Sequence, residues 1–115
     1  MPSVKPFSLR RPKWRAWFSL YILVLLTGCD SDSGQAALGK ELFDANCKVC
    51  HAQGLNGAPI LGNQKMWRDR LPQGVDVLIQ HAVEGYGLMP AKGGRTELGD
   101  EEVAEAVRYM ISEVQ

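Results

Sequence analysis

The segment FDANCKVCHAQG, residues 43–54, places Cys47 and Cys50 with two residues between them and His51 directly after the second cysteine. The whole chain has three cysteines, so two of them lie in this one segment. A pair of this kind can form a redox disulfide, supply half of a zinc site or, together with the histidine, attach a haem covalently. The rest of the sequence has to decide among these three chemistries.

The surroundings of the pair favour haem attachment. Redox pairs of the thioredoxin type lie in a βαβ context, and no strand pattern is visible in the chain. A zinc site needs further thiolates or imidazoles, but the only other histidine, His81, is thirty residues from His51. In the haem case one turn of chain presents both sulfurs to the two vinyl groups, and the adjacent histidine can face the iron. The segment therefore predicts one covalent haem c on Cys47 and Cys50, with His51 as an axial ligand.

The N-terminus has the pattern of a secretory signal peptide. Residues 1–16 contain five basic side chains and no acidic one, and an apolar run follows from Trp17 to Leu26. These ten residues are too few to cross a bilayer core, which needs about 20. A basic region before a short apolar run is typical of a signal peptide. We therefore expect the mature protein to act outside the cytoplasm, where unpaired thiols tend to oxidise.

The apolar run ends in LTGC, residues 26–29, which resembles the lipobox of bacterial lipoproteins. The resemblance implies that Cys29 is acylated and becomes the first mature residue, so that its lipid chains tether the protein to a membrane. Asp30 in the next position implies retention at the inner membrane rather than the outer one. A signal cleaved elsewhere, or an uncleaved anchor, is the alternative. The expected organisation is a signal peptide over 1–28, a flexible tether over 29–37 and one mono-haem domain over 38–115.

Removal of the signal would change the charge of the chain. The full sequence has 13 basic and 13 acidic residues, and five of the basic ones lie in residues 1–16, so 8 remain against 13 acids. The resulting net charge of −5 disfavours a nucleic-acid partner. The remaining residues are enough for one small domain, and domains of this size often depend on a metal, disulfide or cofactor for stability.

Hydrophobic spacing predicts an all-α domain. A short amphipathic helix with Leu38, Leu42 and Phe43 leads into Cys47. A short helix is expected in KMWRDRL, residues 65–71, and a longer one over residues 75–84. The last helix, DEEVAEAVRYMISEV over residues 100–114, has acids in its first turn and one apolar stripe. That stripe consists of Val103, Val107, Met110 and Val114. The long loops between these helices need a group to pack against.

A second iron ligand is expected in the loop YGLMPAKG, residues 86–93. Met89 lies there beside Pro90, where little apolar packing is expected for a methionine. Most methionines are packing residues, as expected for Met66 and Met110 on their helices. His81 is the second candidate, but its helical position lies away from the apolar face. Met89 is the preferred axial ligand.

Together these motifs resemble class I cytochrome c, and within that class the small bacterial cytochromes of the c-five type. The resemblance covers about residues 38–110. It implies that Gly39 and Phe43 of the first helix pack against Tyr109 of the last. It further implies that the carbonyl of Pro59 accepts a hydrogen bond from His51, which would fix the ring and raise its basicity.

The same resemblance assigns the haem environment. It implies that Leu61 packs on the haem, that Trp67 and Arg70 lie near its propionates, and that Met89 is the distal ligand. The c-five type carries an extra cysteine pair between the ligand methionine and the last helix. Arg95 and Leu98 stand where those cysteines would fall, so we expect that loop to be less constrained.

The implied function is one-electron transfer, because iron held by histidine and methionine has no open position for a substrate. We expect redox partners such as a quinol-oxidising complex, a terminal oxidase or a periplasmic reductase. Lys48, Lys92 and Arg95 are expected to border the exposed haem edge and orient these partners. A haem enzyme or a gas or redox sensor with a displaceable methionine is the alternative.

Overall fold

A computed structural model describes residues 31–115 of the chain. The expected signal peptide, the expected acylation site at Cys29 and the neighbouring Asp30 lie outside the described residues. Within the described part, no helix is both long and apolar enough to cross a membrane.

Short helices and loops make up the described domain, as the sequence predicts. The helices are α2 (Ser31–Asn46), α3 (Lys48–His51), α4 (Gln64–Trp67), α5 (Val75–Glu84) and α6 (Asp100–Ser112). Three 3-10 turns lie between them, η2 (Leu55–Gly57), η3 (Leu71–Gln73) and η4 (Ala91–Gly94). Residues 31–115 form no strand, and their only β-type pairing is an isolated bridge between Tyr86 and Met89. The predicted all-α class is confirmed.

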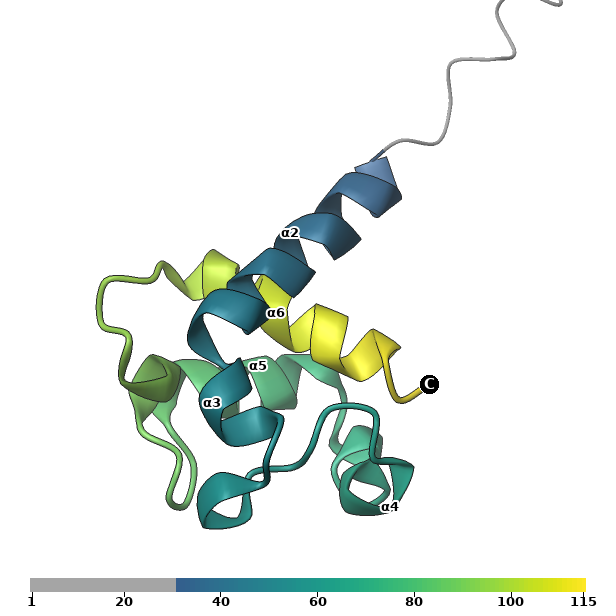
Figure 1. Ribbon diagram of the computed structural model, residues 1–115, viewed down its shortest axis with the longest axis vertical. Helices are drawn as coiled ribbons and strands as arrows, with labels where there is room; N and C mark the ends of the chain where they lie inside the picture. The colour runs from purple at the N-terminus through teal and green to yellow at the C-terminus, as the bar shows by residue number, and fades with distance from the viewer. Residues whose placement is uncertain (1–30) are drawn as a thin grey trace, which may run out of the picture.

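The first helix differs from the sequence-based expectation. It begins at Ser31, so the described part of the expected flexible tether is helical. Asp32 in the first turn interacts favourably with the helix dipole, and alanines at 36 and 37 are strong helix formers. This part of α2 extends away from the other elements (Figure 1), and Leu38 there is 47% exposed instead of packed. Local propensity therefore extends the helix beyond the part that packs.

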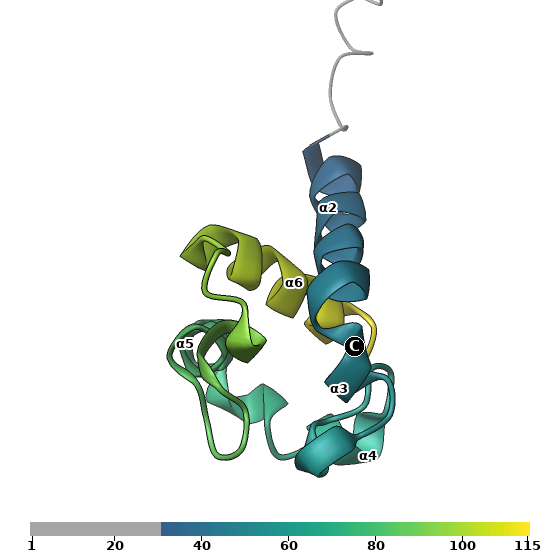
Figure 2. The ribbon, with the colours of Figure 1, turned by 60° about the vertical axis from the view of Figure 1, so that its left-hand side comes forward.

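Helix α2 crosses α6 at Gly39 (Figures 1 and 2). A Cβ atom at Gly39 would lie 2.6 Å from the carbonyl oxygen of Glu105 and 2.8 Å from the Cβ of Tyr109. One turn further along, the rings of Phe43 and Tyr109 pack with centroids 5.7 Å apart and planes tilted by 55°. The contact expected among Gly39, Phe43 and Tyr109 is present, and it is close because Gly39 has no side chain.

The core is built around α6, which packs against both α2 and α5. All four residues of the predicted α6 stripe are buried. Ala104, Ala106 and Ile111 are buried as well, because α6 has neighbours on two sides. Phe43, Trp67 and Ala82 add buried side chains from α2, α4 and α5. This core surrounds the segments that carry the candidate site residues.

Lys92 braces the loop between η4 and α6. Its ammonium donates a hydrogen bond to the carbonyl oxygen of Leu98 at 2.7 Å and pairs with Asp100 at 2.7 Å. Arg95 and Leu98, which stand where related proteins carry the extra cysteines, are joined by a backbone hydrogen bond of 3.1 Å. The loop expected to be less constrained is therefore held by polar contacts to the start of α6.

Replacing Gly39 by alanine should destabilise the fold, because the new methyl group would overlap the backbone of α6. Overpacking of this kind costs about 1–3 kcal/mol, more than the ~1 kcal/mol that alanine gains in helix propensity over glycine. Urea unfolding followed by circular dichroism measures the difference.

Gly34→Ala is the matched control, since Gly34 lies on the same helix with no atom within 4 Å of an added Cβ. This variant should be neutral or slightly more stable. If both substitutions changed the free energy of unfolding equally, the close contact at Gly39 would be contradicted.

Lys92→Ala should remove the brace and lower the free energy of unfolding by about 1.5–3 kcal/mol, the usual contribution of a hydrogen bond with a charged partner. Thermal unfolding at low and high salt checks this, with Lys65→Ala as the control because Lys65 is exposed on α4. A loss no larger than that of the Lys65 variant would mean that Lys92 does not hold the loop.

Candidate functional site

The two cysteines lie where α2 passes into α3. The Cys47 amide donates to the carbonyl of Phe43 at 2.9 Å, and the amides of Cys50 and His51 both donate to the carbonyl of Cys47, at 3.2 and 3.1 Å. One turn of chain therefore holds both thiols and the imidazole. Both cysteines are free and partly buried. Burial raises the pKa of the Cys47 thiol, partly opposed by the positive charge of Arg95.

His51 is buried and held by the backbone. Its side chain is 8% exposed, and its Nδ1 lies 2.9 Å from the carbonyl oxygen of Pro59. A carbonyl oxygen can only accept a hydrogen bond, so Nδ1 carries the proton. Nε2 makes no hydrogen bond within residues 31–115. The expected hydrogen bond from His51 to Pro59 is therefore present, and it leaves Nε2 as a free lone-pair donor.

The segment after His51 is held by hydrogen bonds to carbonyl groups. The amide of Leu61 donates to the carbonyl of His51 at 2.8 Å, so the chain turns back onto α3. The indole Nε1 of Trp67 donates to the carbonyl of Ile60 at 2.9 Å, and the ring itself is 4% exposed. Arg70 donates to the carbonyl of Met66 on α4. The bonds of Leu61 and Trp67 fix the loop that carries Pro59, whereas the bond of Arg70 is local to the end of α4.

Met89 is partly buried and packs against the main core. It lies in a hairpin after α5, where its backbone exchanges two 3.0 Å hydrogen bonds with Tyr86. Cys47 and Leu61 pack against the same core cluster. The structure thus brings the first cysteine, the leucine and the methionine to one apolar core from three separate segments.

His81, the second candidate for an iron ligand, makes a different contact. Its ring stacks on Tyr86 with centroids 4.0 Å apart and planes inclined by 19°. No spacing pattern predicts this pair, because it joins the end of a helix to a loop across Gly85. Sequence patterns also do not predict the hydrogen bond from Trp67 to the carbonyl of Ile60 or the contacts of Lys92 with Leu98 and Asp100. Backbone acceptors and long side chains in loops leave no periodic signal.

The cations expected at a docking edge are partly engaged within the domain. The Nζ atom of Lys48 lies 3.4 Å from Oδ1 of Asp44, and Nη1 of Arg95 lies 3.9 Å from Oε1 of Glu97. Both basic side chains are well exposed. Lys92 is only 23% exposed and uses its ammonium for Leu98 and Asp100. Its contribution to docking is therefore smaller than the sequence suggested.

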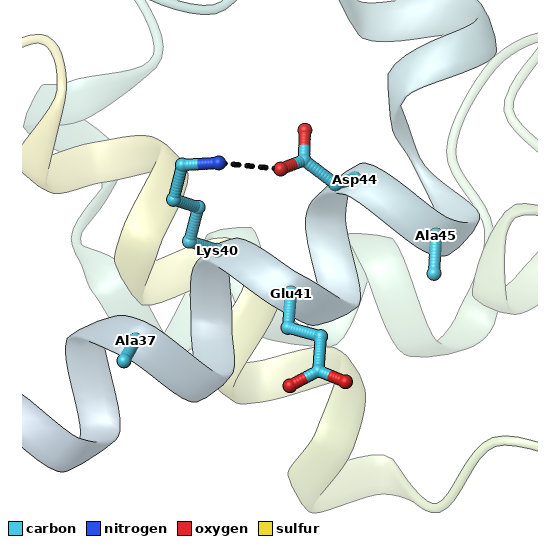
Figure 3. Close-up of a pocket in the computed structure, with 5 residues that line it drawn as sticks. All are labelled: Ala37, Lys40, Glu41, Asp44 and Ala45. Carbon is cyan, nitrogen blue, oxygen red and sulfur yellow. Dashed lines mark hydrogen bonds and ion pairs between the residues drawn. The ribbon is translucent and has the colours of Figure 1, made fainter.

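An open depression lies on the outer face of α2, next to the ion pair of Lys48 with Asp44 (Figure 3). It is lined by Ala37, Lys40, Glu41, Asp44 and Ala45. Lys40 and Asp44 form an ion pair there, whose hydrogen bond lowers the pKa of Asp44. Because one helix supplies all the lining side chains and both partners are solvent-exposed, this depression has no features of a cofactor site.

The donor set of the Cys47–His51 turn fits a covalently attached haem. Two free thiols are separated by two residues, and the imidazole beside them has one nitrogen anchored and the other free. Exposed apolar side chains border the turn and the Met89 hairpin, with Val49 66%, Leu55 50% and Leu88 76% exposed. By contrast, residues 31–115 contain no group of three or more His, Cys, Asp or Glu side chains that could hold a metal ion by themselves.

Comparisons with known proteins agree with this chemistry. The family described as cytochrome C oxidase, cbb3-type, subunit III matches residues 34–110. Cytochrome c-555 of Prosthecochloris aestuarii is 43% identical over 97 residues, covering 77% of this chain and 98% of that protein. Cytochrome c5 of Ectopseudomonas mendocina is 32% identical over 82 residues, covering 70% of this chain and 94% of the relative.

A solved structure is also similar. It is a chain from the crystal structure of an electron transfer complex of nitrite reductase with cytochrome c. The TM-score is 0.64 at 37% identity, over 68% of this chain and 95% of that one. The shared fold and the haem-binding turn lead to one conclusion: the chain belongs to the class I c-type cytochromes, electron carriers rather than enzymes, with one covalently bound haem c.

Proposed function

We propose that this cytochrome carries single electrons through a haem attached at Cys47 and Cys50 and ligated by His51 and Met89. The observation that carries the proposal is the His51 ring, whose Nδ1 is fixed by Pro59 at 2.9 Å while Nε2 is free of protein partners within the described residues. A ring held in this way needs no rearrangement to coordinate iron.

The distal side supports Met89 over His81. Met89 is partly buried against the core, whereas the His81 ring is stacked on Tyr86. With haem bound and both axial positions filled, the cofactor supplies one-electron chemistry without an open position for substrate. The Met89 thioether would stabilise the ferrous state relative to a second histidine, and the Pro59 hydrogen bond would increase the basicity of His51.

The remaining site residues would shape the cofactor's surroundings. Leu61 and Trp67 would keep water away from it, because both pack with the apolar core. Arg70 would lie near the propionates, with one nitrogen already bonded to the carbonyl of Met66. A dry pocket disfavours the extra charge of ferric iron and acts in the same direction as the methionine.

We further propose that the protein works on the periplasmic side of a bacterial envelope, tethered through acylated Cys29. The support is the basic region, short apolar run and LTGC motif of the sequence. Its partners would be redox proteins such as a quinol-oxidising complex, a terminal oxidase or a periplasmic reductase. The similar cytochrome chain in a complex with nitrite reductase supports partners of this general kind.

Replacing Met89 by alanine should abolish the methionine-to-iron charge-transfer band of the oxidised protein. The haem should stay covalently attached, because the cysteines are unchanged, and the reduced variant should bind carbon monoxide readily. Absorption spectra of the oxidised, reduced and carbon monoxide-treated protein measure both effects.

Met66→Ala is the matched control, since Met66 is also a partly buried methionine but lies on α4. Its charge-transfer band should match that of the unmodified protein. A band that survives in the Met89 variant, or is absent from the unmodified protein, would refute ligation by Met89.

Replacing Cys29 by serine should release the cytochrome from the membrane fraction and abolish incorporation of radiolabelled palmitate. Covalent haem should be retained in this variant, because Cys47 and Cys50 remain. Fractionation on a sucrose gradient should place the unmodified protein with the inner membrane. Continued membrane association of the serine variant without label would instead indicate an uncleaved anchor.

A further inference from the structure

The Met89 hairpin is a tightly closed unit. Tyr86 and Met89 donate their amides to each other's carbonyl oxygens, both at 3.0 Å. Gly85 precedes them with φ of +89°, and a Cβ on this residue would lie 2.8 Å from the amide nitrogen of Ala91 and 3.1 Å from the carbonyl oxygen of Met89. Because the two ends of the hairpin touch, Tyr86 and Met89 must move together.

A ring contact joins this unit to α5, in addition to the packing of Met89 on the core and of η4 on α5. The Tyr86 side chain is 63% exposed, so burial in the core does not fix it. Instead it stacks on His81 in the last turn of α5, with ring centroids 4.0 Å apart. The other ring pair within residues 31–115, Phe43 with Tyr109, lies at the crossing of α2 and α6. The His81 ring is therefore the side chain of α5 that holds the exposed Tyr86 ring.

We propose that His81 is a positioning residue for the distal ligand: it holds Tyr86 by stacking, and Tyr86 holds Met89 through the paired backbone hydrogen bonds. The inference rests on the proposed ligation of iron by Met89. His81 itself does not bind the iron in this arrangement. Its role is to limit how often movement of the hairpin takes the Met89 thioether away from the iron.

The test uses imidazole as an external ligand for the oxidised holoprotein, because imidazole can bind only when Met89 has moved away. Removing the stack by His81→Ala should increase the population of this open state. Loss of one aromatic pair is enough to increase the open-state population about two- to tenfold. The apparent dissociation constant for imidazole should fall by that factor, because it scales inversely with the fraction of open state.

Two variants separate stacking from other effects. His81→Phe retains a flat ring and should return the imidazole affinity to within about twofold of the unmodified protein. Gln80→Ala changes the neighbouring exposed residue, whose side chain bonds only Glu84 in the described part of the chain, and should leave the affinity unchanged. Circular dichroism and thermal unfolding check that each variant is folded.

A double-mutant cycle tests the path from His81 to Met89. Tyr86→Ala should have the same effect as His81→Ala, and the double variant should have no larger effect than either single one, because both remove the same contact. Amide exchange at Tyr86 and Met89 should accelerate by about the same two- to tenfold factor, independently of the iron chemistry.

Three outcomes would overturn the inference. One is an imidazole affinity for His81→Ala equal to that of Gln80→Ala, and another is fully additive effects of the His81 and Tyr86 substitutions. The third is an unmodified protein without the methionine charge-transfer band, which would also remove the proposed function. With the band present, failure of the first two tests rejects only the role of His81.

Discussion

The position of the attachment turn depends on the close contact between α2 and α6 at Gly39. The absence of a side chain there lets the backbone of one helix touch the other, and Phe43 then reaches the ring of Tyr109. This contact fixes the end of α2, and Cys47 follows within one turn with its amide bonded to the carbonyl of Phe43. The position of the haem-binding turn in the domain therefore depends on a packing contact far from the chemistry. A side chain at Gly39 would displace α2 and with it the first attachment site.

The loop after the turn has little regular structure, and side-chain donors replace the missing helical hydrogen bonds. Trp67 bonds the carbonyl of Ile60, and His51 bonds that of the adjacent Pro59. Because Trp67 is buried in the core, it connects this loop to the packing of α6. The orientation of the imidazole is thus set by a carbonyl whose own position is set by the core. This arrangement explains how a small domain can hold the His51 ring in one orientation without long helices around it.

The parts of the fold that the sequence predicted are those with a periodic signal. The apolar stripe of α6 required burial, and its four residues are buried. The start of α2 was not predicted, because residues 32–37 are exposed and only weak helix propensity distinguishes a helix from a tether there. At the site, the cysteine spacing was decisive for the attachment turn. The stack of His81 on Tyr86 and the Lys92 brace depend on loop geometry, and no spacing rule contains that information.

The two sides of the site are consequently held in different ways. On the side of His51, the ring is buried, hydrogen-bonded to the backbone and only one residue from Cys50, which anchors the cofactor covalently in this family. On the side of Met89, the hairpin is closed by its own backbone, and its exposed Tyr86 ring stacks on the partly buried His81 of α5. Opening of the distal side would separate the partly buried Met89 from the core, whereas movement of His51 would leave a buried polar group without its partner. Any conformational freedom near the iron should therefore be concentrated in the hairpin. The proximal turn would keep the cofactor in place, while the contacts of the hairpin would set how firmly the Met89 side chain is held.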